Sequence, residues 1–198
     1  MPNNSSNDFI DPELVKYGDP RNVSDQYKTW TVRAIAADLA KQAFPLHIAI
    51  ENYQHDYNIG SIVRSANAFN VTAVHIIGKK HWNRRGAMAT EKYLRIEHHK
   101  STDDFLDWRH QQATDFALIG IDNIAGSIPL SHATLPRQSI LVFGQEGPGL
   151  SEHIQQACAH LIAIEQFGST RSVNVGVAAG IILYEYVRRH TLAKDSSD

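Results

Sequence analysis

Two polar residues in an apolar, helix-like segment raise the first chemical question. The stretch NIGSIVRSANAF (58–69) begins with Asn58 and carries Arg64 six residues later. Its apolar residues recur at helical spacing and form one stripe, which consists of Ile59, Ile62, Val63, Ala66 and Phe69. Arg64 points to nearly the opposite side. An exposed guanidinium can bind a phosphate or stabilise a developing negative charge, although a solvated arginine and a helix cap at Asn58 are the plain alternatives.

A second group surrounds a single carboxylate. In LVFGQEGPGLS (141–151), glycines flank Glu146 on both sides, at positions 144, 147 and 149. Glycine permits a positive φ and a close approach of the backbone to a ligand. The pattern is neither G-x-G-x-x-G nor a P-loop, which disfavours an ordinary dinucleotide site. A tight turn that leads into a helix capped by Ser151 is the alternative.

A third group lies in IEQFGSTRSVNVGVAAG (164–180), where Ser172 and Asn174 bracket the start of a helix. Ser172 is a candidate for the cap of that helix or for a functional role. Asn174 sits in an apolar, small-residue context, where a polar side chain needs a partner. Small residues keep one face of this helix thin and predict close packing against a second segment or a second subunit: Gly176, Ala179 and Gly180.

The segments around these residues alternate between short apolar runs and helical patterns. The runs are rich in Ile and Val and are continuously apolar, which is typical of strands covered on both faces. We expect strands at 46–51, 73–78, 115–122, 139–144 and 160–165, and helices at 29–43, 59–69, 102–113, 151–159 and 173–193. This alternation predicts an α/β fold with a parallel sheet flanked by helices.

Ligands of parallel sheets bind outside the carboxyl ends of the strands. The junctions 52–64, 143–151 and 164–174 each follow a predicted strand and hold the unusual polar residues. We therefore expect one site, assembled from Asn58, Arg64, Glu146, Ser172 and Asn174.

The 198 residues predict one main domain with short extensions. We expect a flexible, extended or disordered arm over 1–28, a helix over 29–45 that contacts RNA, the domain itself over 46–193 and a disordered tail over 194–198. The helix at 29–43 is expected to end before Pro45.

Charge and composition narrow the class of protein. The formal net charge is −2, so the chain as a whole lacks the basic character of a typical nucleic-acid binder, although it has basic clusters at 79–86 and 187–190. The single cysteine, Cys158, excludes an internal disulfide and fits a reducing compartment. No secretory signal is visible, and the most apolar stretch (173–187) is too short to span a membrane. We expect a cytoplasmic protein with no membrane contact.

Taken together, the three segments resemble the motifs of the SpoU (TrmH-like) class of the SPOUT superfamily, the knotted RNA methyltransferases. NIGSIVRSA (58–66) resembles N-x-G-x-x-x-R-[ST]-A, and FGQEGPGLS (143–151) resembles F-G-x-E-x-x-G-L-S. IEQFGSTRSVNVGVA (164–178) resembles I-P-M-x-G-x-x-x-S-L-N-V-S-x-A. Two departures stand out, because Glu165-Gln166 replaces Pro-Met and Gly176 replaces the final Ser. They leave open how the chain contacts the cofactor in detail.

The resemblance implies a C-terminal trefoil knot that binds S-adenosylmethionine, largely through backbone groups. By motif position, the expected cofactor contacts are Gly144, Ile164 and Val173, with Ile121 as a further candidate. The family also works as a homodimer whose active site is assembled from both subunits.

The implied reaction transfers a methyl group to a ribose 2′-hydroxyl of RNA. Arg64 matches the family's arginine, which acts either as the base that takes the hydroxyl proton or as a charged clamp for phosphate and alkoxide. Arginine almost never deprotonates, which favours the clamp. Asn58, Ser172 and Asn174 then position the reactants. Glu146 orients one of these groups or the loop, with general-base catalysis as its alternative role.

The loop KKHWNRRG (79–86) combines charge with an aromatic face, which suits RNA phosphates and an unstacked base. We expect RNA contacts from Lys80, Trp82, Arg84 and Arg85, extended by Arg33 and Lys41. The short chain favours transfer RNA over ribosomal RNA as the substrate. The histidines at 98, 99 and 110 lack metal-ligand spacing with cysteine or carboxylates, so we expect no metal.

Two other functions remain open. One is a catalytically silent protein that holds RNA or cofactor, and the other is an enzyme of the same superfamily that methylates a base nitrogen. The complete set of polar residues argues against the first, and the arginine of the first motif argues against the second.

Overall fold

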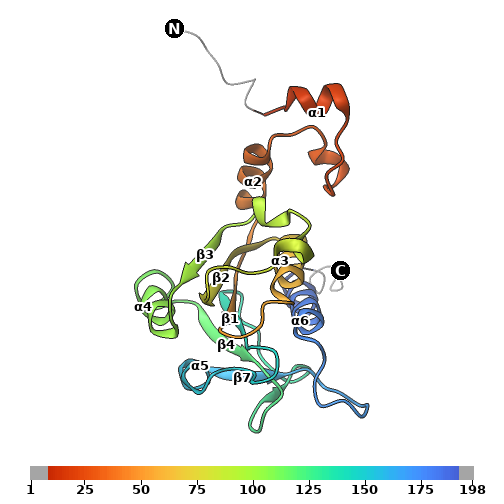
Figure 1. Cartoon of the computed structure of the whole chain (residues 1–198). Helices are drawn as coiled ribbons and strands as arrows, with labels where there is room; N and C mark the ends of the chain where they lie inside the picture. Colours follow the sequence, from red (N-terminus) through yellow and green to blue (C-terminus); the bar gives the residue numbers. More distant parts are fainter. Residues whose placement is uncertain (1–8, 192–198) are drawn as a thin grey trace.

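The computed structural model describes residues 9–191 of the chain. Its centre is a sheet of seven strands in the order β3-β2-β1-β6-β4-β7-β5, in which every neighbouring pair is parallel (Figure 1). The strands are β1 (Phe44–Asn52), β2 (Val71–Gly78), β3 (Ile96–His99), β4 (Ala117–Ile121), β5 (Ile128–Pro129), β6 (Ser139–Phe143) and β7 (His160–Ala163). The predicted α/β fold with a parallel, helix-flanked sheet is confirmed.

Helices cover both faces of the sheet and create two apolar cores. One face packs against α3 (Ile59–Ala68) and α6 (Val175–His190), and the other packs against α4 (Thr102–Gln112) and α5 (Glu152–Ala157). Successive residues of β1 serve both cores, since Ile48 and Ile50 join the first and Ala49 joins the second. This explains why the strands are apolar throughout and do not alternate with polar residues.

The five predicted strands are all present, with ends that differ by at most two residues from the predicted ones. Two further strands, β3 and β5, were missed by the sequence analysis. β3 reads Ile-Glu-His-His and β5 is only two residues long, so neither has the continuous apolar run that identifies a buried strand. Short 3-10 segments, η2 (Arg84–Ala87) and η3 (Thr90–Lys92), lie between β2 and β3.

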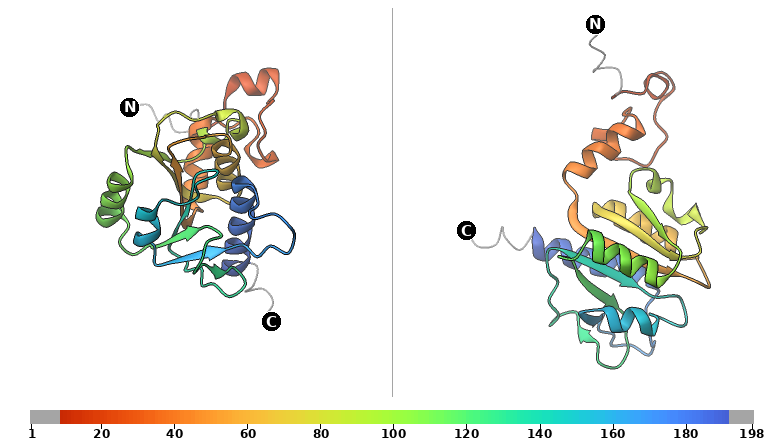
Figure 2. Two further views of the ribbon diagram at one scale, coloured as in Figure 1. Left: turned by 60° about the horizontal axis from the view of Figure 1, so that its bottom comes forward. Right: turned by 90° about the vertical axis from the view of Figure 1, so that its left-hand side faces the viewer.

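The N-terminal segment differs from the expected extended arm. It forms α1 (Pro12–Tyr17), the 3-10 segment η1 (Asp25–Tyr27) and α2 (Val32–Lys41). Asp19 and Arg21 form an ion pair at 2.6 Å, and Arg21 also donates to the backbone of Trp30. These contacts between nearby residues do not appear as a hydrophobic pattern, which is why the sequence analysis missed them. Figure 2 shows that α1 and α2 project beyond the sheet.

The boundaries of two predicted helices also change. The helix expected at 29–43 is α2, which begins after the cap at Thr31 and ends at Lys41, and Pro45 lies inside β1. The last helix begins at Val175, and positions 192 and 193 of its predicted range lie outside the described residues, as do 1–8 and the predicted tail at 194–198. Within residues 9–191, no helix is long and apolar enough to cross a membrane.

Candidate active site

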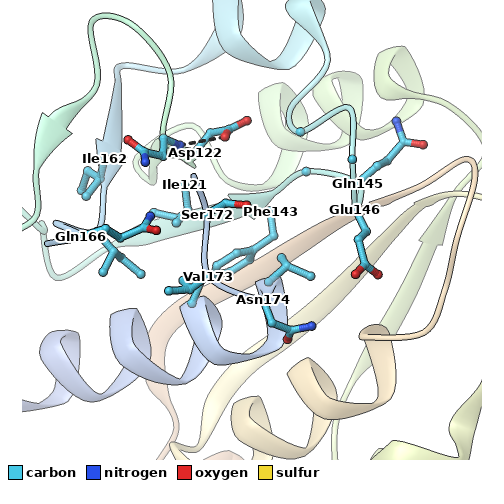
Figure 3. A pocket seen from close by; sticks show the side chains of 17 residues that line it. Ile121, Asp122, Phe143, Gln145, Glu146, Ile162, Gln166, Ser172, Val173 and Asn174 are labelled. Atoms are coloured by element: carbon cyan, nitrogen blue, oxygen red, sulfur yellow. Dashed lines mark hydrogen bonds between the residues drawn. The ribbon is translucent and has the colours of Figure 1, made fainter. Parts of the chain in front are cut away.

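A pocket of about 400 Å³ opens at the carboxyl ends of β4, β6 and β7, where it meets the start of α6 (Figure 3). This volume lies within the range of about 300–1,000 Å³ that is usual for small-ligand sites. The segments around the pocket come from distant parts of the chain. Its lining is Ile121, Asp122, Asn123, Phe143, Gly144, Gln145, Glu146, Gly147, Gly149, Ile162, Ile164, Gln166, Ser172, Val173, Asn174, Val175 and Ala178.

All four predicted cofactor contacts line this pocket: Ile121, Gly144, Ile164 and Val173. Gly144 is required by the geometry of its own loop. After Gly144 the chain turns back, and Gln145 and Gly149 exchange two backbone hydrogen bonds at 3.0 Å. A Cβ at position 144 would lie 2.1 Å from the carbonyl carbon of Gly149. The glycines of this motif therefore form a compact backbone wall rather than a flexible turn.

The polar residues of the three motifs form one hydrogen-bonded chain. Asn58 Nδ2 donates to Glu146 Oε2 at 2.8 Å, and Asn174 Nδ2 donates to Asn58 Oδ1 at 2.9 Å. Asn174 Oδ1 in turn accepts from the backbone N–H of Gly176 and Val177, which caps α6. The chain links a carboxylate through two neutral amides to the start of a helix. The predicted meeting of these three residues is present in the structure.

The structure decides between the capping and functional roles that the sequence left open for Asn58 and Ser172: neither side chain caps a helix. Asn58 precedes α3 but makes no side-chain cap, because its amide binds Glu146 and Asn174 instead. Ser172 does not cap α6, since Asn174 occupies that role, and Ser172 lines the pocket. Ser151 does cap its helix, α5, by accepting from the backbone N–H of Ile154.

Arg64 stands apart from the other predicted site residues. Its side chain is exposed on α3, on the side away from the core, and it lines neither the main pocket nor the smaller one beside Asn58. Among the described residues, Arg64 has no hydrogen-bond or ion-pair partner. A single chain therefore brings Asn58, Glu146, Ser172 and Asn174 to the site and leaves the guanidinium outside it.

Asp122 and Asn123 were missed by the sequence analysis, although they follow β4 at the edge of the sheet where ligands bind. Asp122 accepts from the backbone N–H of Asn123 and, through its other oxygen, from that of Leu150, both at 2.8 Å. Asn123 Nδ2 donates to the carbonyl of Arg171 at 3.0 Å. The pair fastens the second motif to the loop of the third. The sheet-edge rule applied to the end of DFALIGID would have found it.

Two buried polar residues at the end of β1 were also missed. Glu51, which is 1% exposed, accepts from the backbone N–H of Ser151 at 2.8 Å and so joins β1 to the start of α5. Asn52, also 1% exposed, donates to the carbonyls of Lys79 and His81. Asn52 thereby holds the base of the loop that was predicted to contact RNA.

That loop packs directly on the first turn of α3. A Cβ on Gly60 would lie 2.8 Å from the backbone nitrogen of Ala87 and 2.9 Å from Gly86 Cα, so only glycine permits this approach. The basic residues of the loop are exposed: Lys80, Arg84 and Arg85. Trp82 differs from the expectation of an open aromatic face, because it is half-buried against the core and its ring lies 5.8 Å from the Arg84 guanidinium.

The two departures from the motif have local physical reasons. Glu165 accepts from the backbone N–H of Ser131 at 3.0 Å, and hydrogen bonds from the side chain and the backbone of Ser131 lower the pKa of the carboxyl group. A Cβ on Gly176 would lie 3.3 Å from the Cβ of Ser61, so the small residue lets α6 approach α3 closely. Neither departure disrupts the pocket.

A histidine chain lies outside the pocket, across three strands. His47 Nδ1 lies 2.8 Å from His75 Nε2, and His75 Nδ1 lies 2.9 Å from His99 Nε2. Potential ligand atoms of His75, Glu97 and His99 lie within 4.8 Å of one another, a grouping that the spacing along the sequence does not reveal. The facing ring nitrogens are already hydrogen-bonded to each other. The absence of a bound metal stays a prediction.

Cys158 lies at the end of α5 and is half-buried. Burial raises the pKa of its thiol to about 12, so the group stays protonated near neutral pH. The reactive form of a cysteine is the thiolate, so the half-buried, protonated thiol of Cys158 fits a packing role.

Known proteins share both the sequence and the fold of this chain. It is 28% identical over 159 residues to the 23S rRNA (guanosine-2′-O-)-methyltransferase RlmB of Neisseria meningitidis serogroup B. The aligned segment covers 76% of this chain and 61% of that protein. The chain thus spans about three-fifths of the length of that curated relative.

Two solved structures extend the comparison. The SpoU methyltransferase AviRb from Streptomyces viridochromogenes, in complex with the cofactor AdoMet, matches with a TM-score of 0.65 and 27% identity, over 73% of this chain and 57% of that chain. The A. aeolicus TrmH/SpoU tRNA modifying enzyme matches with a TM-score of 0.70 and 25% identity, over 82% of this chain and 84% of that chain. The model of the SpoU rRNA Methylase family matches residues 45–184. The chain belongs to the SpoU rRNA Methylase family.

Proposed function

We propose that this protein transfers a methyl group from S-adenosylmethionine to a ribose 2′-hydroxyl of RNA. The observation that carries the proposal is the convergence of Asn58, Glu146 and Asn174, one from each family motif, beside a pocket of small-ligand size. The AdoMet-bound relative and the relatives named as 2′-O-methyltransferases support the same reaction. The complete set of polar motif residues at the rim of the pocket argues against a catalytically silent protein.

The residues of the pocket fit this cofactor. Apolar side chains from β4, β6 and β7 offer walls for a flat ring, and the second motif offers backbone groups where Gly144 allows close approach. Bound S-adenosylmethionine supplies an electrophilic methyl group on a sulfonium. Glu146 lies at the end of the pocket next to Asn58 and places a carboxylate where a positive charge is favoured (Figure 3).

Arg64 acts as a clamp in this mechanism. A charged guanidinium binds the RNA phosphate and stabilises the negative charge that develops on the ribose oxygen while its proton passes to solvent water. The amides of Asn58 and Asn174 orient the ribose or the cofactor, and Ser172 donates or accepts a further hydrogen bond. Glu146 fixes the direction of the Asn58 amide through its 2.8 Å hydrogen bond.

The active enzyme is a homodimer, because one chain does not bring Arg64 to its own pocket. The α6 helix next to α3 exposes an apolar stripe of Val177, Ile181 and Tyr184, with exposed fractions of 54%, 38% and 52%. The residues recur at i, i+4 and i+7 and so share one face. We propose that a second copy covers this stripe and that the Arg64 of one subunit acts at the site of the other. The trefoil threading of the C-terminal chain belongs to the same proposal.

RNA contacts come from the loop that packs on α3, through Lys80, Arg84 and Arg85, with Trp82 supporting the loop from below. Residues 29–45 extend this surface through Arg33 and Lys41. Transfer RNA is the first candidate substrate, because the tRNA modifying relative matches this chain over most of both lengths. Ribosomal RNA, the substrate named for the curated relative, is the second. A cytoplasmic location is part of the same proposal.

The test is methyl transfer from labelled S-adenosylmethionine to purified transfer RNA and ribosomal RNA, followed by nuclease digestion. Ribose methylation protects the neighbouring phosphodiester bond, so the label should appear in nuclease-resistant dinucleotides. The Arg64→Ala variant is the control for contaminating activity.

Each other outcome identifies a different function. Label in digestible mononucleotides would indicate methylation of a base nitrogen. Tight cofactor binding without incorporation into either RNA would indicate a silent binding protein. Mapping of methylated nucleosides in RNA from a strain that lacks the protein would then identify the nucleotide.

A further inference from the structure

An unpaired, buried amide oxygen marks the cofactor pocket of this chain. The Oε1 atoms of Gln145 and Gln166, which both line the pocket, are inaccessible to solvent and have no hydrogen-bond partner among the described residues. Gln166 lines the pocket, and Figure 3 shows its terminal amide pointing inward, toward the other labelled side chains. A buried carbonyl oxygen without a donor is costly, so the position calls for a donor that the protein itself does not provide.

The neighbouring residue holds this amide in place. Glu165 accepts from the backbone N–H of Ser131 at 3.0 Å, which fastens the loop to the segment after β5. A proline at this position would restrict the loop through its fixed φ, whereas Glu165 restricts it through a hydrogen bond. The Glu165-Gln166 pair thus combines a fixed loop with a polar group aimed at the ligand.

The surroundings of Gln166 select the kind of donor. Ile121, Ile162 and Ile164 line the same pocket and suit the faces of a planar ring. Figure 3 shows Ile162 and Gln166 at one end and Glu146 at the other. The second carboxylate, Asp122, has both oxygens occupied by backbone N–H groups. The neutral amide of Gln166 lies among isoleucines and therefore matches a neutral, planar amine. A positively charged ammonium would instead favour the end of the pocket that holds the Glu146 carboxylate.

We propose that Gln166 Oε1 accepts a hydrogen bond from the exocyclic 6-amino group of the cofactor's adenine, and that this side chain gives the pocket its selectivity for adenine. The inference rests on the proposed use of S-adenosylmethionine. It assigns to Gln166 a side-chain contact, in addition to the backbone contacts that the pocket offers. Glu165 is a positioning residue for the same contact.

Calorimetry without RNA tests the inference. The ligands are S-adenosylhomocysteine and its 6-deamino analogue, which has hydrogen in place of the amino group, and the proteins are the wild type and Gln166→Met. Loss of one neutral hydrogen bond should weaken binding of S-adenosylhomocysteine about 3- to 10-fold in the variant. The deamino analogue should bind both proteins with nearly equal affinity, because it offers no donor to Gln166.

Gln111→Met is the matched control, since it makes the same change at an exposed position of α4. It should retain the full wild-type preference for S-adenosylhomocysteine over the deamino analogue. Glu165→Gln, which keeps an acceptor for Ser131, should also retain it, and Glu165→Ala should lose part of it. Equal discrimination by Gln166→Met and the wild type would overturn the inference. If neither ligand binds the wild type, the proposed cofactor use fails instead, and thermal melts separate both results from misfolding.

Discussion

At the scale of single residues, the site depends on how neutral amides share their hydrogen bonds. Asn58 uses its nitrogen for Glu146 and its oxygen for Asn174, so each of its two polar atoms has a protein partner. Asn174 adds the helix cap to the same chain. These hydrogen bonds fix the directions of Asn58, Glu146 and Asn174 at the rim of the pocket. Arg64 contributes charge from outside this network.

The first prediction concerns Arg64. Arg64→Lys keeps the positive charge and loses the planar, bidentate geometry, so turnover on RNA should fall at least about 100-fold. Binding of S-adenosylhomocysteine should stay within about 2-fold of the wild type, because Arg64 lines neither pocket. Single-turnover methylation and calorimetry measure the two quantities. A lysine variant with wild-type turnover would contradict the clamp.

The second prediction concerns Asn174. Asn174→Ala removes the cap of α6 and leaves Asn58 Oδ1 without its donor, so the free energy of unfolding should fall by about 1–2 kcal/mol. Asn174→Asp keeps the cap acceptor and places a carboxylate oxygen opposite Asn58 Oδ1 in place of the donor, so it should recover the part of the stability that comes from the cap but not the activity. Urea unfolding and methyl-transfer assays separate the two effects. Equal stability of the alanine and aspartate variants would argue against a capping role.

At the scale of elements, backbone contacts through glycine bring the motifs together. The second motif closes on itself at Gly144, and the basic loop lies on α3 at Gly60. In both places a backbone atom occupies the position that a side chain would need. The cofactor pocket and the predicted RNA surface therefore depend on different glycines and can be perturbed separately.

The third prediction uses that separation. Gly60→Ala should push the 79–87 loop away from α3, because its Cβ would lie 2.8–3.0 Å from three backbone atoms. RNA affinity should fall about 10-fold or more, while cofactor binding remains. The control is Gly168→Ala, whose Cβ would meet no atom within 4 Å. Filter binding and calorimetry measure both affinities, and a variant that binds RNA normally would show that the loop is not the RNA surface.

The fourth prediction concerns the histidine chain across β1, β2 and β3. Burial is the largest of the causes that lower the pKa of His47 to about 4 and that of His75 to about 2. The positive charge of Arg95 contributes to both shifts, and the neighbouring His47 and His99 contribute to that of His75. The unfolded chain, with histidine pKa values near 6.5, takes up protons that the folded chain excludes. Stability should therefore be fully present above pH 6.5 and decrease as the pH falls toward 4.

For His47 alone the loss between pH 7 and pH 5 should be about 2 kcal/mol, measured by urea unfolding at each pH. His47→Gln should show a smaller slope over the same range. Glu185, whose pKa its hydrogen bonds with Arg188 lower to about 2, acts only below about pH 4.5 and does not confuse the comparison. A free energy of unfolding that stays constant from pH 7 to pH 5 would exclude the neutral histidine chain.

At the scale of the whole molecule, the distribution of exposed groups points to a second copy. The pocket lies at the carboxyl ends of the strands, and Arg64 is exposed on α3 outside that pocket. The apolar stripe of α6 is also exposed to solvent. An exposed stripe of this kind on a long helix usually marks an interface. Dimer formation and catalysis should therefore be lost together.

The fifth prediction tests this coupling. Tyr184→Glu places a charge at the C-terminal end of the stripe and should convert a dimer into monomers at micromolar concentration, with loss of methyl transfer and retention of cofactor binding. Val15→Glu is the matched control, because Val15 has a similar exposed fraction (59% against 52%) but lies on α1. Sedimentation velocity measures the mass. A Tyr184→Glu dimer with full activity would exclude α6 as the interface.

The sequence by itself determined the α/β class, the five long strands and the family. Continuous apolar runs indicate strands that are buried on both faces. The polar residues of the three motifs indicate the site, because polar side chains are unusual beside such apolar segments. Four residues that line the pocket, Ile121, Gly144, Ile164 and Val173, were identified in this way, as was the grouping of Asn58, Glu146 and Asn174.

Only the tertiary structure decided which atoms pair. The hydrogen bonds of Asn58 to Glu146 and Asn174, the fastening role of Asp122 and the histidine chain connect residues that lie 24 to 116 positions apart. Periodicity reports which face of an element a residue occupies, but it contains no information on the distance between two elements. That distance depends on how the strands are ordered in the sheet and on which glycines let backbones touch, and these are properties of the folded chain.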